Sequence, residues 1–250
     1  MTSLEGGVAL VTGASSGIGA ATAEVLTTEG MTVHALARRS ERLQRLATQL
    51  GCTTHTLDVR DADALAELVT SIGPIDVLIN NAGLGRAGGS LATATLDDVE
   101  RSVDTNVTAA INLVRLCLPN MIERGRGHIV NVGSMVGLYP VASALYGATK
   151  GAMHLLSLDL RLELQGTGVK VSEICAGRVD TEFYDVAIDD PERAAQVKDS
   201  GIEEVTADDV ADTIAYALKV PWRVNINRIE LQPTEQTYGG VEFVPRTEVT

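Results

Sequence analysis

Val8-Ala-Leu-Val-Thr-Gly-Ala-Ser-Ser-Gly-Ile-Gly19 is the stretch from which the fold of this chain can be predicted. Its apolar residues 8–11 suit a strand that is buried on both faces, and helix-forming residues begin at Ala20. Strand, glycine-rich turn and helix in this order predict the opening of a βαβ unit. The free N–H groups at the start of such a helix attract an anion, and a dinucleotide pyrophosphate is the natural occupant. A glycine-rich turn without a ligand is the alternative interpretation.

The spacing of the glycines indicates which dinucleotide-binding fingerprint the turn matches. Gly13 can take backbone angles that are closed to other residues, while Gly17 and Gly19 allow a phosphate or a neighbouring strand to come close. The first gap is longer than in the common G-x-G-x-x-G fingerprint. It resembles the signature Thr-Gly-x-x-x-Gly-Ile-Gly of the single-domain short-chain dehydrogenases/reductases, which is present from Thr12 to Gly19. This resemblance implies an α/β fold of the Rossmann type, a single domain over residues 1–250 with a doubly wound, parallel seven-stranded sheet.

Length and composition agree with one enzyme domain. A chain of 250 residues with 45% hydrophobic residues fits a single α/β domain with an ample core. The net charge of −13 argues against nucleic acid and anionic membranes as partners, since both repel an acidic surface. No apolar run is long enough to span a bilayer. Three cysteines without metal or redox spacing, and no signal peptide, predict a cytoplasmic protein.

Alternating apolar runs and breakers predict the order of the elements. The expected strands are residues 8–11, 32–37, 53–57, 75–79, 128–132, 169–175 and 227–232. A long, mostly helical stretch is expected over residues 96–121, and another helix over 144–165. Residues 182–205 are polar, acidic and irregular, which predicts a mobile lid over the substrate, with Phe183 and Tyr184 as its apolar contacts. Residues 233–250 form a C-terminal tail.

The end of the second strand indicates the cofactor. NAD-specific relatives have an acidic residue there that binds the ribose hydroxyls, but this chain has Ala37, followed by Arg38 and Arg39. A guanidinium at this place suits the 2′-phosphate of NADP by charge and by bidentate geometry. Two ordinary surface arginines are the alternative, but their location at the carboxyl end of a strand favours NADP.

The resemblance implies the remaining cofactor contacts. Asp58 corresponds to the acidic residue that meets the adenine ring, and Asn80-Asn-Ala-Gly83 corresponds to the segment that lies along the cofactor. After the sixth strand, Ala176 replaces the family's proline, and Val179 and Thr181 fall at cofactor-contacting positions. The full set expected to bind the cofactor is Gly13, Ser15, Ser16, Gly17, Ile18, Gly19, Arg38, Arg39, Asp58, Val59, Asn81, Ala82, Gly83, Tyr146, Lys150, Val179 and Thr181.

Three side chains have chemistry that fits hydride transfer. Hydride transfer to a carbonyl leaves an alkoxide that needs a proton, and a tyrosine has an ordinary pKa of about 10. Lys150, one helical turn beyond Tyr146, supplies a charge that lowers this pKa and can hold the nicotinamide ribose. Ser134 would hydrogen-bond the substrate oxygen. Ser143 is a rival for this role, but it lies too near Tyr146.

The resemblance adds Asn106 as a kink in a helix that holds a water of the proton relay, so that Asn106, Ser134, Tyr146 and Lys150 match the catalytic tetrad of the family. The leading function is reversible NADP(H)-dependent oxidation of a secondary alcohol. A non-catalytic dinucleotide-binding regulator is the rival from another class, and it is disfavoured because Tyr146 and Lys150 are both present. A homotetramer is expected from the resemblance, with some support from the apolar excess of the helices at 96–121 and 144–165.

The sequence leaves two substrate classes open. Residues 224–240, Arg38-Arg39 and Thr181-Glu-Phe183 resemble the NADP-dependent 3-hydroxy acid (serine) dehydrogenase branch of the family. A carboxylate substrate needs a cation in the pocket, and Arg86 and Arg178 are the candidates. The alternative is a general ketone or diketone reductase. Its apolar pocket would be lined by Leu138, Tyr139, Val141 and Leu145, in a Ser134-to-Tyr146 loop that is one residue shorter than is usual in the family.

Overall fold

A computed structural model describes residues 2–85, 90–141, 143–240 and 242–246. The sheet has seven strands in the order β3-β2-β1-β4-β5-β6-β7, and every neighbouring pair is parallel. The strands are β1 (Val8–Thr12), β2 (Thr32–Ala37), β3 (Thr53–Thr56), β4 (Val77–Asn80), β5 (Gly127–Ser134), β6 (Val169–Ala176) and β7 (Arg228–Leu231). The predicted seven-stranded doubly wound sheet is therefore confirmed, with strand ends that differ by up to two residues.

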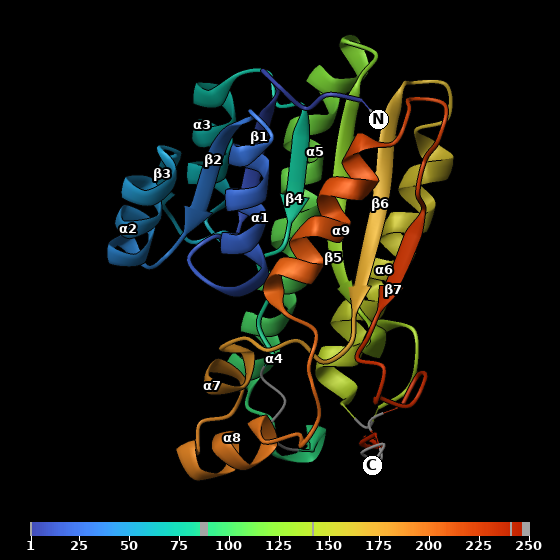
Figure 1. The fold of residues 1–250 in the computed structure, drawn as a ribbon. Coiled ribbons are helices and arrows are strands. Elements are labelled where there is room, and N and C mark those ends of the chain that lie inside the picture. Colours follow the sequence, from blue (N-terminus) through green and yellow to red (C-terminus); the bar gives the residue numbers. More distant parts are fainter. Residues whose placement is uncertain (1, 86–89, 142, 241, 247–250) are drawn as a thin grey trace.

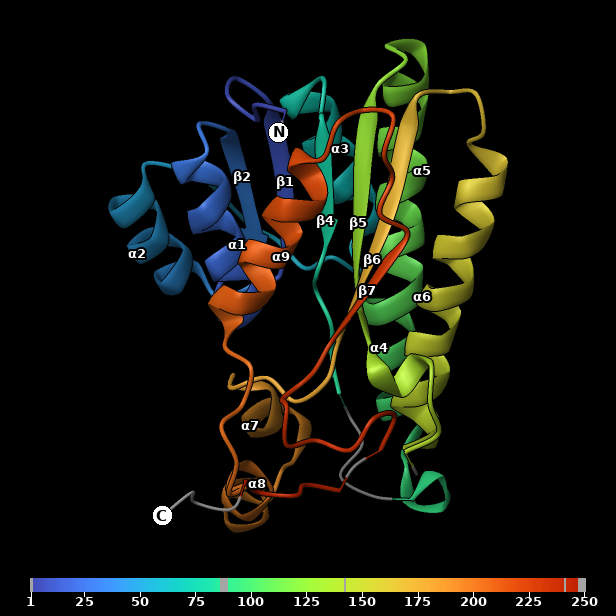
Figure 2. The same cartoon turned by 45° about the vertical axis from the view of Figure 1, so that its right-hand side comes forward.

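Helices cover both faces of the sheet, which makes three layers (Figures 1 and 2). On one face, α1 (Gly17–Thr28), α2 (Ser40–Leu50) and α9 (Ala207–Lys219) enclose an aliphatic core that includes Val11, Leu26 and Ile214. On the other face, α3 (Ala62–Ile72), α5 (Ala109–Glu123) and α6 (Ala144–Glu163) enclose a second core around Leu78 and Ile129. Within the described residues, no helix is long and apolar enough to cross a membrane.

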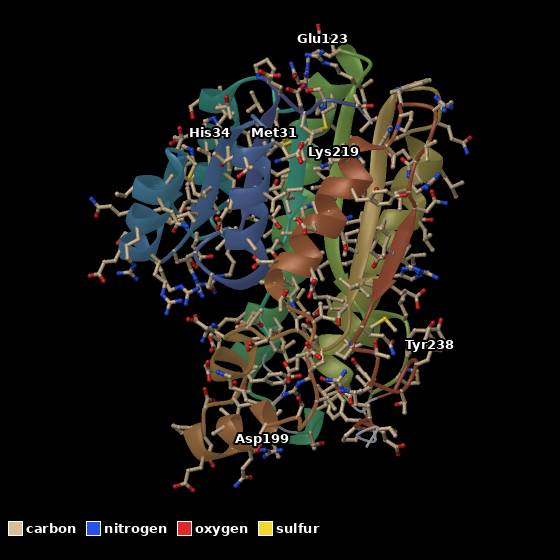
Figure 3. All side chains as sticks on the ribbon, viewed as in Figure 1. Met31, His34, Glu123, Asp199, Lys219 and Tyr238 are labelled. Atoms are coloured by element: carbon tan, nitrogen blue, oxygen red, sulfur yellow. The ribbon has the colours of Figure 1, made fainter. Side chains whose placement is uncertain are left out.

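The strand order reverses between β1 and β4, because β2 lies on one side of this pair and β5 on the other. Parallel strands that diverge in this way leave a crevice at their carboxyl ends, where α/β proteins bind their ligands. Two short helices, α7 (Phe183–Ala187) and α8 (Pro191–Lys198), lie beyond this end of the sheet (Figure 1). Asp199, directly after α8, lies at the same end of the molecule (Figure 3).

The prediction of an irregular segment over residues 182–205 was wrong, since α7 and α8 are both helical. Asp190 caps α8 by accepting hydrogen bonds from the N–H groups of Glu192 and Arg193, and Pro191 occupies the first turn. Both are start signals for a helix, and they begin a helix of eight residues. The helix α2 begins at Ser40, and Arg39 occupies its cap position without a side-chain hydrogen bond.

The long helical stretch is confirmed, and it is interrupted where Asn106 lies. Between α4 (Leu96–Val103) and α5 the chain forms a π-helical turn, Asp104–Thr108. A π-bulge inside an α-helix often marks a functional site. The helix is therefore irregular where the kink was expected, and Asn106 in this turn is 2% exposed.

A buried histidine on β5 predicts acid sensitivity. His128 lies beside Ser172, with Nε2 and Oγ 2.8 Å apart, and burial, helped by the charge of Lys170, lowers its pKa to about 3. Between the ordinary pKa of about 6.5 and 3, the unfolded chain binds a proton that the folded chain does not, so stability falls as the pH drops through this window. We expect this proton to add a slope of about 1.4 kcal/mol per pH unit to the free energy of unfolding.

The test is urea unfolding of the wild type and of His128→Gln between about pH 4 and pH 6. This range lies between the pKa of His128 in the folded chain, about 3, and its ordinary value of 6.5. Glutamine retains a hydrogen-bonding side chain but cannot take up the proton. The wild type should lose stability with acid more steeply than the variant, and parallel pH curves would contradict the assignment.

Candidate active site

A cavity of about 810 Å³ opens at the carboxyl ends of the strands. The described residues that line it include Gly13 of the glycine-rich turn, Asn81 after β4, Ser134 at the end of β5 and Tyr146 of α6. Of the residues predicted to bind the cofactor or to act in catalysis, every one lines this cavity except Gly19 and Asn106. The topology therefore brings together residues that are more than 100 positions apart in the chain, as the hydrogen bond between Arg39 and Glu182 (separation 143) illustrates.

The glycine-rich turn is shaped for a close ligand. Gly13 and Gly17 have φ angles of 68° and 52°, which side chains rarely tolerate. Gly19 has a different reason to be glycine, because a Cβ atom there would lie 2.5 Å from both Asn81 Nδ2 and Gly13 O. Gly19 therefore packs the turn against the segment after β4, and Gly17 and Ile18 at the N-terminus of α1 line the cavity.

The segment after β4 is fixed by Thr12. The Thr12 hydroxyl accepts hydrogen bonds from the N–H groups of Asn81 and Ala82, at 3.0 and 2.9 Å, and donates to the Ile79 carbonyl. The Asn81 amide donates to the Thr12 carbonyl at 2.8 Å. These bonds hold residues 81–83 along the wall of the cavity, where the resemblance places the cofactor.

Asp58 lies at the expected adenine end of the cavity. Its carboxylate accepts a hydrogen bond from Arg60 Nη2 at 2.8 Å, and Arg38 Nη1 lies 3.9 Å away. The hydrogen bonds from Arg60 are the main reason why the pKa of Asp58 is lowered. Arg38 itself is largely exposed and makes no closer ion pair among the described residues, so its guanidinium can turn towards an incoming phosphate.

Asn106 supports the site from behind the cavity. Its Oδ1 accepts from Leu84 N–H at 2.7 Å, and its Nδ2 donates to Leu84 O and to Thr149 Oγ1, both at 2.9 Å. Thr149 is the neighbour of Lys150 on α6. The amide therefore ties the loop after β4 to α6, in addition to the water-binding role that the resemblance implies.

Ser134 and Tyr146 meet at the inner end of the cavity. The Ser134 hydroxyl lies close enough to Tyr146 to favour the phenolate by hydrogen bonding, whereas burial opposes the phenolate more strongly and raises the pKa of Tyr146 overall. The Ala176 carbonyl oxygen, 3.3 Å from Ser134 Oγ, is the alternative acceptor for the single hydroxyl proton. Ser143, the rival serine, is absent from the described lining of this cavity.

Lys150 is 6% exposed and lies under the Tyr146 ring, with Nζ 5.9 Å from the ring centroid. Nζ donates a hydrogen bond of 2.8 Å to the Val132 carbonyl on β5. Burial lowers the pKa of Lys150 to about 8, while Cys175 and Glu173 act in the opposite direction. A cation placed here lowers the pKa of the neighbouring tyrosine whenever it is protonated.

Comparison with known proteins settles the family. Residues 7–191 match the family described as short chain dehydrogenase. Serine 3-dehydrogenase of Rhizobium radiobacter is 38% identical over 94% of this chain and 97% of its own length. NADP-dependent 3-hydroxy acid dehydrogenase YdfG of Escherichia coli (strain K12) is 37% identical over 94% and 98% of the two chains.

This chain belongs to the short chain dehydrogenase family. Among solved structures, the closed form of serine dehydrogenase complexed with NADP⁺ superposes with a TM-score of 0.89 at 37% identity, covering 96% of this chain and all of that one (100%). The family, the fold and the dehydrogenase class expected from the sequence are thereby confirmed.

In this short chain dehydrogenase, residues from the 182–205 segment and from the described part of the tail line the cavity. Phe183 packs against Tyr146 with ring centroids 5.4 Å apart, and Tyr184 stacks edge-on against Phe183. The expected apolar contacts of the lid are therefore present. Gln236 and Phe243 of the tail also line the cavity, which the sequence analysis did not foresee because no motif marks them.

Arg178 is already engaged by the protein itself. Its Nε donates to Glu204 at 2.6 Å, its Nη2 donates to the carbonyls of Val197 and Lys198, and its guanidinium lies 4.6 Å from the Tyr184 ring. The side chain is 6% exposed. Arg178 therefore holds the C-terminal end of α8 and the residues after it, and it is poorly suited to clamp a substrate carboxylate. The other candidate, Arg86, lies outside the described residues.

The loop proposed as an apolar pocket divides between two hollows. Val141 lines the main cavity, whereas Leu138 and Tyr139 line only a neighbouring hollow, and Leu145 lines neither. The Tyr139 hydroxyl donates to Glu230 at 3.0 Å, beside Tyr238 of the tail. Val141 lines the neighbouring hollow as well, so three of the four residues expected in an apolar pocket lie together there.

Proposed function

We propose that this chain interconverts a small polar secondary alcohol and its ketone with NADP(H), with 3-hydroxy acids such as serine as the first candidates. The observation that carries the proposal is the convergence of Ser134, Tyr146 and Lys150 on the cavity that also contains the glycine-rich turn. The relatives named as serine and 3-hydroxy acid dehydrogenases match nearly the whole chain, which supports the substrate class.

The residues of this chain fit the cofactor. The positive φ angles of Gly13 and Gly17 and the nearby arginines provide a cradle for phosphate groups. NADP, when bound, supplies the hydride acceptor or donor. Val179 and Thr181 line the same cavity as Asn81 and Gly83, so two segments far apart in the chain offer contacts to a bound dinucleotide.

The chemistry of the protein is proton transfer. We assign Tyr146 as the acid in ketone reduction and the base in alcohol oxidation, acting at the substrate oxygen. Ser134 would donate a hydrogen bond to the same oxygen, and Lys150 would favour the phenolate and bind the nicotinamide ribose. Asn106 would hold a water of the proton relay, and its hydrogen bonds to Leu84 and Thr149 would keep the surrounding structure in place.

The second candidate is a general ketone or diketone reductase. It is favoured by the apolar surface that Val141, Phe183, Val186 and Phe243 contribute to the cavity, and by the commitment of Arg178 to Glu204. A screen of 3-hydroxy acids with NADP⁺, and of simple ketones and diketones with NADPH, separates the two. Turnover of neutral ketones far above that of every hydroxy acid would overturn the acid proposal.

Arg178 gives a sharper test of how an acid is bound. Because its guanidinium supports the lid, we expect Arg178→Ala to raise KM roughly tenfold for hydroxy acids and for neutral alcohols alike, since the displaced lid misplaces both. Steady-state kinetics with a matched pair, a 3-hydroxy acid and its methyl ester, checks this. A rise confined to the free acid would instead make Arg178 the carboxylate clamp.

We also propose a homotetramer in the cytoplasm. Leu155, Leu158 and Leu162 of α6 are 57, 42 and 66% exposed in the single chain, and Ile111 of α5 is 44% exposed. Apolar residues that repeat along one helix face favour burial against another subunit. The three cysteines are free thiols, which suits a reducing compartment.

Sedimentation equilibrium tests the assembly. We expect a tetramer at micromolar protein concentration, and a smaller species for Leu158→Glu, because a charge in a buried apolar contact is costly. Glu163→Gln, a change near the end of the same helix, should leave the mass unchanged. A wild-type monomer would refute the proposal.

A further inference from the structure

A cluster of charged side chains joins the start of α2 to the start of the lid. The Glu182 carboxylate accepts a hydrogen bond from Arg39 at 3.0 Å and two from Arg42, at 2.7 and 2.6 Å. Arg39 also donates to the hydroxyls of Ser15 and Ser16 in the glycine-rich turn. The cluster therefore lies over the turn and spans the cavity wall between residues that are 140 positions apart.

The partners of Glu182 are the groups that a phosphate would need. Two guanidiniums and a serine hydroxyl recognise a phosphate by the same charge-assisted hydrogen bonds that they make to a carboxylate. Arg39 is one of the two arginines expected to bind the 2′-phosphate of NADP. A phosphate and the Glu182 carboxylate cannot both take these donors, because two anions held at one place repel each other.

Glu182 is held as an anion but can leave. The hydrogen bonds from Arg42, and then those from Arg39, lower its pKa, so it is ionised at neutral pH. Its side chain is 43% exposed, which means that water can solvate the carboxylate once the arginines release it.

We propose that the Glu182 carboxylate occupies the 2′-phosphate site, that NADP displaces it, and that Arg42 joins Arg39 in binding the phosphate. This inference rests on the proposed use of NADP. NAD lacks the 2′-phosphate, so Glu182 keeps its hydrogen bonds to Arg39 and Arg42 when NAD binds. Glu182 and Arg42 are then determinants of cofactor specificity, and neither belongs to the cofactor motif of the sequence.

The exchange also reaches the catalytic side of the cavity. Glu182 directly precedes Phe183, the first residue of α7, whose ring packs 5.4 Å from the Tyr146 ring. Release of Glu182 from Arg39 and Arg42 frees the first residue of the lid. Binding of the 2′-phosphate is thereby coupled to motion of the segment that covers the substrate.

Two small ligands isolate the effect. Adenosine 2′,5′-bisphosphate and adenosine 5′-monophosphate differ only in the 2′-phosphate, and calorimetry measures their affinities for the full chain. We expect Glu182→Gln to bind the bisphosphate about three- to tenfold more tightly, because the competing anion is gone, and to bind the monophosphate as the wild type does. Arg42→Met should lower the affinity for the bisphosphate by a similar factor.

Asp185→Asn is the matched control. Asp185 is another exposed acid of the lid, but it pairs with Lys198 and not with the arginines of α2, so its replacement should change neither affinity. Amide hydrogen exchange gives a second readout. The bisphosphate should raise exchange over residues 183–187 in the wild type, and it should cause no further rise in Glu182→Gln.

The outcomes are separable. Unchanged affinities in Glu182→Gln would overturn the inference. An equal loss of affinity for both ligands in Glu182→Gln would also overturn it, since Glu182 would then contribute to binding of the adenosine that the two ligands share. If the wild type itself fails to prefer the bisphosphate over the monophosphate, the proposed use of NADP fails, and this inference fails with it.

Discussion

Tyr146→Phe is expected to lower turnover by roughly 10²- to 10⁴-fold while the affinity for cofactor stays the same. The change removes the hydroxyl that Ser134 approaches and leaves the ring in contact with Phe183 and above Lys150. The phenylalanine fits the same space, so the fold and the cavity remain. Stopped-flow or steady-state assays in both reaction directions, with a cofactor-binding titration, measure the two effects separately.

Tyr184→Phe is the matched control for this variant. Tyr184 lines the same cavity and loses the same atom, but its ring packs on Arg178 and Phe183 and it has no proposed role in proton transfer. It should retain most of the activity. Comparable activity in Tyr146→Phe and Tyr184→Phe would remove Tyr146 from the catalytic role.

The second large effect concerns the choice of cofactor. We expect the wild type to prefer NADPH over NADH, and Ala37→Asp with Arg38→Ala to shift the ratio of kcat/KM for the two cofactors by roughly 10²-fold towards NADH. Loss of a charge-assisted hydrogen bond and the new repulsion together give about 3 kcal/mol. The aspartate at the end of β2 would also accept hydrogen bonds from the ribose hydroxyls.

Arg45→Ala is a control on the same helix, because Arg45 is exposed on α2 and does not line the cavity. Its ratio should equal that of the wild type. A wild-type preference for NADH, or an unchanged ratio in the double variant, would count against NADP as the working cofactor.

The sequence predicts the framework of this site because its signals are local. Apolar runs of the right length correspond to strands, and parallel strands end at one edge of the sheet, so Gly13, Asn81, Ser134 and Thr181 have to meet there. The spacing of Tyr146 and Lys150 places both on one helix face. Each of these inferences depends on a short segment and on a repeating geometry.

The contacts that shape the substrate end could not be predicted in this way. Arg178 and Glu204 are 26 positions apart and Arg42 and Glu182 are 140 apart, and no periodicity relates either pair. Which residues form these pairs depends on how residues 182–205 fold. The sequence predicts an irregular segment there, although Asp190 and Pro191 start a helix. The sequence therefore indicates that Arg178 binds a substrate carboxylate, whereas in the structure Arg178 pairs with the Glu204 carboxylate.

The central claim is that this cavity transfers a hydride between a secondary alcohol and NADP. The most direct test uses a 3-hydroxy acid carrying deuterium on the alcohol carbon, incubated with NADP⁺ and either the wild type or Tyr146→Phe. The account predicts a ketone product and deuterium on the nicotinamide ring of NADPH with the wild type, and almost none with the variant. If neither this alcohol nor any other secondary alcohol or ketone exchanges a hydride with NADP(H), the account is contradicted.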